Sequence, residues 1–314
     1  MAKTSGTTTT VAVADRQLAL SNLSKILYPE TGTTKGEVID YYSRIAPVLI
    51  PHLAGRPLSL KRYPNGVDGQ GFFAKNVPNG APPWVRTERL PAPGSTMNRD
   101  EIDYLVLPEN DGDALATIVW LANLAALELH VPQWTVGPRG GVRGTDLLVF
   151  DLDPGAPATV VECAAVALRL RKVLDADGLT AVAKTSGSKG MQVYAAIKPV
   201  DPGRTSDYAK SVAQKLEKDD PEKVTSVMAR AVRPGRIFID WSQNNTAKTT
   251  VAPYSLRARP APTVSTPLHW DEVAACRRPE DLVFRFDDVL ARAAEDGDLF
   301  ADLLVEKRPV LPRG

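Results

Sequence analysis

Apolar positions in the first third of the chain recur at the spacing of a helix. The positions are Val38, Ile39, Tyr42 and Ile45. Thr34 precedes them and can cap the first turn, so we expect a helix to begin there. Pro47 interrupts the pattern, and Gly55 and Pro57 end it. The segment LSLKRYP that follows has the composition of a strand.

Further along, helical and strand-like stretches alternate. Residues 113–130 predict a buried helix that leads into a short strand, and residues 160–178 predict an amphipathic helix that ends at a glycine. LLVFDLDPG and residues 180–197 have the short apolar runs of buried strands, the latter interrupted by a glycine loop. We expect residues 205–233 to be helical, IFIDWSQNN to be a strand with a polar exit, and about the last 30 residues to be helical.

These patterns together predict a mixed α/β fold, with the sheet strands flanked by helices. Residues 1–14 are small and polar and predict a disordered tail. Because no internal repeat and no Pro/Ser-rich linker divides the rest, we expect residues 15–314 to form a single domain.

Composition narrows the class of protein. The 314 residues are 43% hydrophobic and 24% charged, which is ordinary for a globular protein. The two cysteines, Cys163 and Cys276, lack metal-ligand spacing, which argues against a disulfide framework or a zinc site. The first residues have no apolar core of a signal peptide, and no apolar run reaches membrane-spanning length. We therefore expect a cytoplasmic protein.

The net charge of +1 conceals segregation of charge along the chain. Residues 230–259 contain six basic residues and one acid, whereas residues 281–302 contain seven acids and two arginines. A local basic surface can bind phosphates whatever the total charge is, although scattered solvated arginines are the simpler interpretation.

LVFDLDPG places two carboxylates at the end of an apolar run. Residues i and i+2 of a strand share a face, so Asp151 and Asp153 point the same way and repel each other unless a cation or proton lies between them. Mg²⁺ or Mn²⁺ prefers such oxygen ligands. Asp240 ends another apolar run, and three converging carboxylates could hold two ions for phosphoryl or nucleotidyl transfer. A strand-terminal turn is the alternative for the pair taken alone.

Two other stretches contain groups that suit nucleotide binding. KTSGSKGMQVY contains Ser186, Ser188 and Lys189 between glycines, and these side chains and backbone N–H groups could meet phosphates. The spacing is not that of a Walker A loop, and a tight β-turn explains it equally well. Phe72 and Phe73 lie among cations that include Lys61, an arrangement that suits base stacking, although an adjacent Phe pair taken alone is more often part of a hydrophobic core.

Taken together, several ordered stretches resemble the polymerase domain of bacterial DNA ligase D, a branch of the archaeo-eukaryotic primase superfamily. They are NLSKILYP, KRYPNGVDGQGFFAKN, LELHVPQW, LVFDLDPG, TSGSKGMQVY, IFIDWSQNN and KTTVAPYSLRAR, and they span residues 16–300. The resemblance implies a two-lobed primase-polymerase fold with an RRM-like catalytic sheet. It also implies template-dependent nucleotidyl transfer by two-metal catalysis, with Mn²⁺ or Mg²⁺, in gap filling or end joining. In that family ribonucleotides and manganese tend to be preferred.

The resemblance also implies roles for individual residues. The metal-binding carboxylates match Asp151, Asp153 and Asp240. The nucleotide-binding residues match Lys61, Phe73, His130, Ser186, Ser188, Lys189, Arg233, Gln243 and Arg257. A pocket for the DNA 5′-phosphate matches Asn22, Lys25 and Lys35. The implied partners are DNA with gaps or double-strand breaks, nucleoside triphosphates, a separate DNA ligase and a Ku-like end-binding protein, at the nucleoid.

One position departs from the family. The family usually reads SGSKGLHVY, and this chain has Gln192 where that histidine stands. Glutamine donates and accepts hydrogen bonds but carries no positive charge, so the enzyme is expected to be slower or altered in substrate choice. The chain contains no KxDG motif of an adenylating ligase, so we expect a stand-alone relative or an excised domain, the former being favoured.

Two rival functions remain at this stage. A haloacid-dehalogenase-like phosphatase also has DxD after a strand, with Asp151 as nucleophile and Asp153 as acid/base, but Pro154 stands where that family has Gly-Thr. A catalytically weak nucleic-acid-binding module that recruits repair partners is the second rival, and Gln192 is the feature that favours it.

Overall fold

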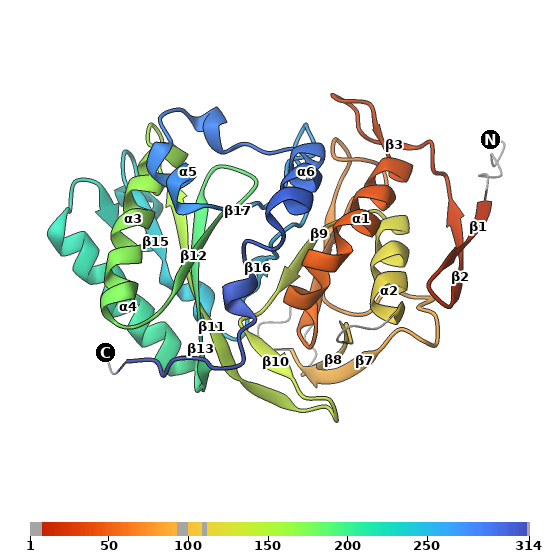
Figure 1. Ribbon diagram of the computed structural model, residues 1–314, viewed down its shortest axis with the longest axis horizontal. Helices are drawn as coiled ribbons and strands as arrows, with labels where there is room; N and C mark the ends of the chain where they lie inside the picture. Colours follow the sequence, from red (N-terminus) through yellow and green to blue (C-terminus); the bar gives the residue numbers. More distant parts are fainter. Residues whose placement is uncertain (1–7, 93–99, 109–111, 313–314) are drawn as a thin grey trace.

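Two β-sheets lie side by side in the molecule, and each packs against its own helices (Figure 1). The computed structural model describes residues 8–92, 100–108 and 112–312. Within these residues helices and strands are interleaved along the chain, which confirms the mixed α/β class. No helix in these ranges is long and apolar enough to cross a membrane.

The first sheet is built mainly from the N-terminal half of the chain. Its strand order is β16-β9-β5-β8-β7, and β6 pairs with β5. The strands are β5 (Pro57–Arg62), β6 (Phe72–Ala74), β7 (Thr87–Pro91), β8 (Glu101–Val106), β9 (Ala126–Val131) and β16 (Thr250–Val251). Helices α1 (Lys35–Leu53) and α2 (Gly112–Asn123) share one hydrophobic core with β5 and β9.

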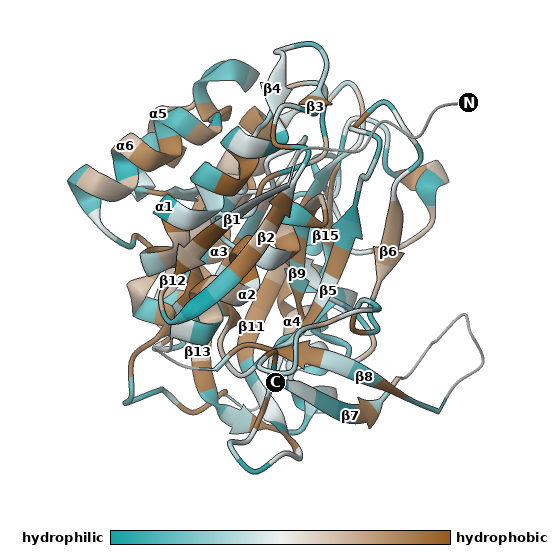
Figure 2. Cartoon of the chain, turned by 90° about the vertical axis from the view of Figure 1, so that its right-hand side faces the viewer, coloured by the Kyte–Doolittle hydropathy of each residue, from teal (hydrophilic) through white to brown (hydrophobic). Residues whose placement is uncertain are grey.

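The second sheet carries the carboxylates expected from the sequence. Its order is β14-β15-β11-β13-β12-β17, and β10 pairs with β11. The strands are β10 (Trp134–Val136), β11 (Val142–Pro154), β12 (Ala181–Thr185), β13 (Met191–Val200), β14 (Val224–Thr225), β15 (Ile237–Asp240) and β17 (Pro267–Leu268). Helices α3 (Val160–Ala176), α4 (Pro202–Asp219) and α5 (Trp270–Ala275) complete a second core. In Figure 2 the interior strands β9 and β11 are mostly brown, whereas β7 at the edge is largely teal.

The chain crosses between the sheets several times. It passes from β9 through β10 to β11, and it returns from β15 through the short helix η2 (Trp241–Asn244) to β16. We call each sheet with its helices a lobe. Further along, α6 (Phe286–Asp296) packs on α1 of the first lobe, and the ring centroids of Tyr41 and Phe286 lie 5.9 Å apart. The short helices η3 (Pro279–Leu282) and η4 (Ala301–Leu303) flank α6. The interpretation of residues 15–314 as one domain stays a prediction.

Helix α1 begins where the sequence predicts. Thr34 accepts a hydrogen bond from the backbone N–H of Glu37, whose side chain bonds back to Thr34, and the two form a capping box. The expected interruption at Pro47 is wrong, because the helix continues through Pro47 and Pro51 to Leu53. Leu49 and Leu53 are fully buried, and this burial outweighs the backbone hydrogen bonds that the prolines remove.

The expected disordered tail is wrong for residues 8–13. Thr8–Val13 form strand β1, which pairs along its whole length with β2 (Arg16–Ser21). Backbone pairing and the partial burial of Val11 and Val13 stabilise this hairpin, which composition alone does not reveal. Residues 1–7 lie outside the described residues.

Three other expectations meet the structure in part. The helix predicted over 205–233 ends at Asp219, because Pro221 disfavours helical backbone at the residue before it. Strand β14 and the short helix η1 (Arg230–Val232) follow. Within residues 285–312 the C-terminal helix prediction holds for α6 and for the short helix η4 (Ala301–Leu303). Two short strands, β3 (Ile26–Tyr28) and β4 (Thr33–Thr34), pair before α1. The Pro, Gly and Asn content of residues 90–101 predicts a loop, and 93–99 of it lie outside the described residues.

Candidate active site

A row of four polar residues crosses the middle of the second sheet. Asp151 on β11 is the register partner of Asp240 on β15 and of Gln192 on β13. Gln192 is in turn the register partner of Lys184 on β12. Because residues directly opposite one another in a sheet share a face, the four side chains lie on one face of the second sheet.

Asp153 joins this row from the same strand as Asp151. It lies two residues further along β11 and therefore on the same face, where it is exposed, whereas Asp151 is partly buried. Figure 1 shows β11 and β15 as neighbours in the second sheet, as the register requires. The structure thus brings the three predicted carboxylates, Asp151, Asp153 and Asp240, together from two strands about 90 residues apart.

Burial and neighbouring negative charges raise the pKa of two of the carboxylates, Asp151 and Asp153. The pKa of Asp151 is raised to about 7, first by burial and then by the negative charges of Asp153 and Asp240, against a hydrogen bond from Gln192. The pKa of Asp153 is also raised, by burial and by Asp240, although Arg233 and Lys248 act in the opposite direction. Such clustering of like charges is typical of sites that bind cations.

Asp240 uses its oxygens within its own turn. Its carboxylate accepts hydrogen bonds from the backbone N–H and hydroxyl of Ser242 and from Nε2 of Gln243, and it lies 3.7 Å from Lys248 Nζ. Among the described residues, no group of three or more His, Cys, Asp and Glu is placed to hold a metal ion. The donor chemistry nevertheless fits a divalent cation, because hard carboxylate oxygens face one another with raised pKa values.

The glycine loop between β12 and β13 turns tightly above this row. The Oγ of Ser186 accepts hydrogen bonds from the backbone N–H groups of Ser188 and Gly190. Gly187 has a φ of +65°, and a Cβ at Gly190 would lie 2.1 Å from the carbonyl oxygen of Leu152, so both positions require glycine. The loop therefore packs directly on the strand that carries Asp151 and Asp153.

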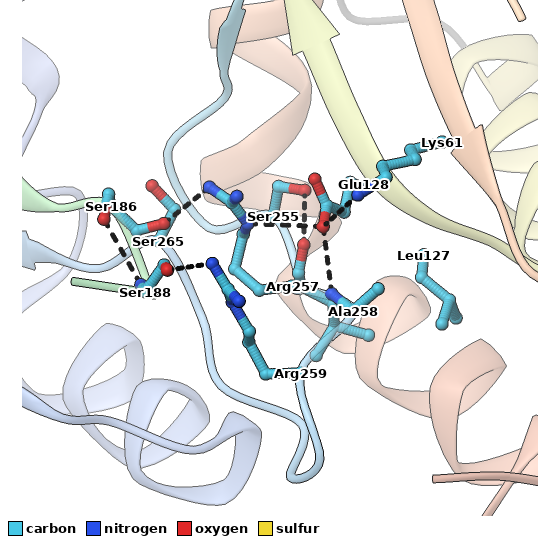
Figure 3. A network of polar contacts seen from close by, with 12 residues as sticks. Lys61, Leu127, Glu128, Ser186, Ser188, Ser255, Arg257, Ala258, Arg259 and Ser265 are labelled. Carbon is cyan, nitrogen blue, oxygen red and sulfur yellow. Dashed lines mark hydrogen bonds and ion pairs between the residues drawn. The ribbon is translucent and has the colours of Figure 1, made fainter. Parts of the chain in front are cut away.

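Two arginines hold the loop from the segment that follows β16. Arg257 donates from Nη1 to the carbonyl oxygen of Ser186 over 2.7 Å, and Arg259 donates to the hydroxyl of Ser188 (Figure 3). Lys189 is exposed at the tip of the loop. Cations and hydroxyls thus meet at one loop, and the part of Ser186, Ser188 and Arg257 in nucleotide binding stays a prediction.

Arg233 lies at the same C-terminal end of β11, against Gly155. Its guanidinium lies 3.7 Å from the centroid of the Phe238 ring and donates to the carbonyl oxygen of Met228. A Cβ at Gly155 would collide with the backbone of Arg233, so the DPG turn fits only with glycine at this position. The guanidinium is close enough to lower the pKa of Asp153.

Three of the predicted nucleotide-binding residues, Lys61, Phe73 and His130, lie on strands of the first sheet. The ring of His130 on β9 meets the exposed ring of Phe73 on β6 edge to face, with centroids 5.3 Å apart. Lys61 on β5 is the register partner of Phe73. His130 and Lys61 both lie beside Glu128, which is 2% exposed: its carboxylate is 2.9 Å from His130 Nε2 and 3.8 Å from Lys61 Nζ.

The predicted 5′-phosphate residues form a separate cluster beside the start of α1. Lys25 is exposed and donates to Asn65, whereas Lys35 is buried and donates to the side chain and carbonyl of Asn123. Burial and the charge of Lys25 lower the pKa of Lys35. Asn22 adopts a left-handed backbone with φ of 54° and accepts the backbone N–H of Lys25. Because the two lysine ammonium groups repel each other, an anion bound between them would be stabilised.

A chain of hydrogen bonds extends from Asp151 into the interior of the protein. Gln192 donates to Asp151, and its Oε1 accepts from the hydroxyl of Tyr194, which also lies 2.9 Å from Thr250 Oγ1. Gln133 donates to the same Thr250 oxygen. Tyr194 and Thr250 line a cavity of about 700 Å³, and none of the three carboxylates belongs to its lining. The candidate active site is the polar row and not this cavity.

Comparison with known proteins identifies the family to which this chain belongs. The family described as LigD, primase-polymerase domain, matches residues 34–300. The chain belongs to this LigD primase-polymerase family. The phosphatase alternative is therefore wrong, and the predicted enzyme class, a nucleotidyltransferase of the polymerase type, is confirmed by family membership. The family uses divalent metal ions in general.

Individual LigD proteins are similar over most of this chain. The multifunctional non-homologous end joining protein LigD of Mycolicibacterium smegmatis is 43% identical over 91% of the chain, and the bifunctional LigD of Bacillus subtilis is 30% identical over 91%. The chain spans 36% and 44% of the lengths of these two relatives. The solved polymerase domain of Mycobacterium tuberculosis ligase D, a complex with DNA, has a TM-score of 0.83 and 41% identity, with 92% of this chain and 98% of that chain covered.

The structure adds residues to the site of this LigD family member that the sequence analysis missed. They are Glu128, Lys184, Tyr194, Lys248 and Arg259. Glu128 stands two residues before His130 on the same strand, so period-2 alternation in LELH could have paired the two side chains. The contacts of Lys184 and Tyr194 depend on strand register, which no local signal in the sequence predicts.

Proposed function

We propose that this chain is a template-dependent polymerase that adds ribo- or deoxyribonucleotides to a primer 3′-hydroxyl at short gaps or breaks in DNA. The observation that carries the proposal is the position of Asp151 and Asp153 on β11 directly beneath the serine and glycine loop that Arg257 holds. Carboxylates and phosphate-binding groups within one site suit nucleotidyl transfer.

The two sheets bind different parts of the nucleotide. The hydroxyls of Ser186 and Ser188 and the cations Lys189, Arg233 and Arg257 bind the triphosphate on the side of the second sheet. Phe73 offers a face on which the incoming base stacks. Lys61, His130 and Gln243 line the rest of the pocket. Because these groups come from both sheets, the nucleotide bridges the lobes.

Asp151, Asp153 and Asp240 would hold two divalent cations, Mn²⁺ or Mg²⁺. Such ions, when bound, neutralise the triphosphate and lower the pKa of the primer hydroxyl. The protein's contribution is rigidity: Asp151 and Asp240 are fixed by β-sheet register, and Gln192 orients the Asp151 carboxylate through one hydrogen bond. The hydrogen bonds of Asp240 to Ser242 and Gln243 orient the third carboxylate.

The DNA substrate contributes a second anchor. Asn22, Lys25 and Lys35 would bind the 5′-phosphate on the far side of a gap. Neither lysine forms an ion pair with a carboxylate in the described part of the chain. The names of the relatives support a role in non-homologous end joining. A separate DNA ligase and a Ku-like end-binding protein stay predicted partners. A cytoplasmic, nucleoid-associated location stays a prediction.

Primer extension on a short gap tests this function. With labelled nucleotides and Mn²⁺ or Mg²⁺, the unmodified chain should extend the primer, and Asp151→Ala should abolish extension while binding of gapped DNA stays within about twofold. No extension by the unmodified chain under any metal condition would instead support a DNA-binding module that recruits repair partners. Gln192, at the position of the family histidine, is the observation that keeps this second function open.

A further inference from the structure

Glu128 is a buried carboxylate at the centre of the predicted nucleotide pocket. Its Oε1 lies 3.4 Å from Arg257 Nε and 3.8 Å from Lys61 Nζ, and its Oε2 lies 2.9 Å from His130 Nε2. Oε1 also accepts a hydrogen bond from the backbone N–H of Ala258 over 3.0 Å. Figure 3 shows Glu128 between Lys61 on one side and Arg257 and Ala258 on the other.

These contacts connect the two lobes. Glu128 belongs to β9 of the first sheet, and Arg257 belongs to the segment between β16 and β17. Arg257 in turn donates to the carbonyl oxygen of Ser186, in the loop between β12 and β13 of the second sheet. A single carboxylate of the first sheet therefore holds, through one guanidinium, the loop expected to bind the triphosphate.

The charge on Glu128 is retained in spite of its burial. Burial raises the pKa of the carboxyl group, but the hydrogen bond from His130 and the positive charge of Arg257 outweigh it and lower the pKa to about 2. Burial also lowers the pKa of His130 against the pull of Glu128, so a neutral ring donates its Nε2–H to the carboxylate at neutral pH. The cluster then contains one negative charge and the two cations Lys61 and Arg257.

The distances indicate how Glu128 acts on these cations. Lys61 and Arg257 lie beyond the length of a short charge-assisted hydrogen bond, which is about 2.8 Å. The positive charges of Lys61 and Arg257 are attracted to the Glu128 carboxylate, while other N–H donors of the two side chains point away from it. Arg257 uses one donor on Ser186, and Lys61 lies 5.3 Å from the centroid of the Tyr63 ring. Such an arrangement aligns cations without consuming the donors that a phosphate needs.

We propose that Glu128 is a positioning residue for nucleotide binding, which fixes Lys61, His130 and Arg257 in place before a nucleoside triphosphate arrives. The inference rests on the proposed function of the site, and Glu128 itself touches no substrate. By holding the cations in place, Glu128 favours binding of the triphosphate. Its negative charge alone would repel the triphosphate. Positioning and simple repulsion therefore predict changes of opposite sign.

The test is the affinity of the full chain for fluorescently labelled ATP with Mg²⁺, measured beside its affinity for gapped DNA. Glu128→Gln keeps the size and an acceptor for the Ala258 N–H but removes the charge. We expect the dissociation constant for ATP to rise at least tenfold and that for DNA to change less than twofold. An unchanged or lower dissociation constant for ATP overturns the proposal.

Two further variants separate positioning from folding. Asp298→Asn is the matched control, because Asp298 is a mostly buried carboxylate that also pairs with a histidine, His52, and with Tyr254, and it contacts none of the predicted nucleotide-binding side chains. It should lower the melting temperature as Glu128→Gln does and leave ATP affinity within twofold. Glu128→Asp keeps the charge on a shorter side chain and should restore part of the affinity, and it carries the test if Glu128→Gln does not fold.

The outcomes distinguish this inference from the proposed function. If the unmodified chain binds ATP and extends primers while Glu128→Gln binds ATP equally well, the proposed function stands and the role of Glu128 is wrong. If the unmodified chain neither binds ATP nor extends primers, both are wrong. An equal loss of ATP affinity in Asp298→Asn would assign Glu128 a general structural role and would also overturn the inference.

Discussion

Gln192 Nε2 donates a hydrogen bond to Asp151 Oδ1 over 3.1 Å, and the two residues are register partners on adjacent antiparallel strands. The amide therefore orients the carboxylate from within the sheet, and its own oxygen accepts from Tyr194. A residue that departs from the usual family sequence thus occupies a fixed place beside the predicted metal ligands.

Replacement of Gln192 tests whether this orientation matters. Gln192→Leu removes both hydrogen bonds and leaves the Tyr194 hydroxyl with Thr250 as its side-chain partner. We expect the rate of primer extension to fall about tenfold, the effect of about 1.4 kcal/mol in transition-state stabilisation. The measurement is kcat/KM for nucleotide incorporation at fixed pH and metal concentration.

Gln192→His provides the comparison for this prediction. A histidine ring can still donate to Asp151, so its activity should exceed that of Gln192→Leu. Equal rates for the two variants would indicate that the hydrogen bond to Asp151 does not contribute to catalysis, provided that both variants keep the circular dichroism spectrum of the unmodified chain.

Lys25 offers a sharper test of the 5′-phosphate cluster than Lys35. Lys35 is buried and bonded to Asn123, so its removal destabilises the fold as well as the cluster. Lys25→Ala removes an exposed cation and should weaken binding to gaps with a 5′-phosphate by about tenfold, while gaps with a 5′-hydroxyl are bound as before. Titrations of both DNA substrates at several salt concentrations should also give a shallower salt slope for the variant. Equal affinity of the unmodified chain for the two ends would contradict the pocket.

Acid should destabilise the protein partly through Glu128. Its folded-state pKa of about 2 lies below the ordinary value of 4.5, so the stabilisation is fully present above about pH 4.5 and is lost as the pH falls towards 2. The difference corresponds to about 3 kcal/mol of unfolding free energy at neutral pH. Glu128→Gln lacks this contribution, so its free energy of unfolding should fall less steeply between pH 5 and 2. Urea unfolding of both proteins at pH 7, 4 and 3 measures the two slopes, and parallel slopes would refute the assignment.

The capping box of α1 should contribute measurably to stability. Thr34→Ala removes the side chain that accepts the Glu37 N–H, at a cost of about 1 kcal/mol. For a protein of this size the melting temperature should fall by about 2 °C. Thr180→Ala, at an exposed position just before β12, is the control and should leave the melting temperature unchanged. A similar decrease in both variants would argue against the cap.

Much of the site was predictable because its chemistry is local in the sequence. An apolar run that ends in DLDP predicts a buried strand with two carboxylates on one face, and β11 confirms this. The order of the motifs also predicts the family, which the comparisons confirm. The pattern fails where stability comes from distant contacts: Pro47 lies inside α1, and Thr8–Val13 pair with β2. In both places burial and backbone pairing outweigh local propensity.

By itself the sequence determined the mixed α/β class, the identity of the three carboxylates and the loop of serines and glycines, because each depends on periodicity or on residue type within a few positions. Only the tertiary structure decided which side chains meet. Strand register places Asp240 and Gln192 on either side of Asp151, and the packing of two lobes brings Arg257 to Glu128 and Ser186. Contacts of this kind join residues up to about 130 positions apart, and their formation depends on the packing of whole sheets, which no local pattern contains.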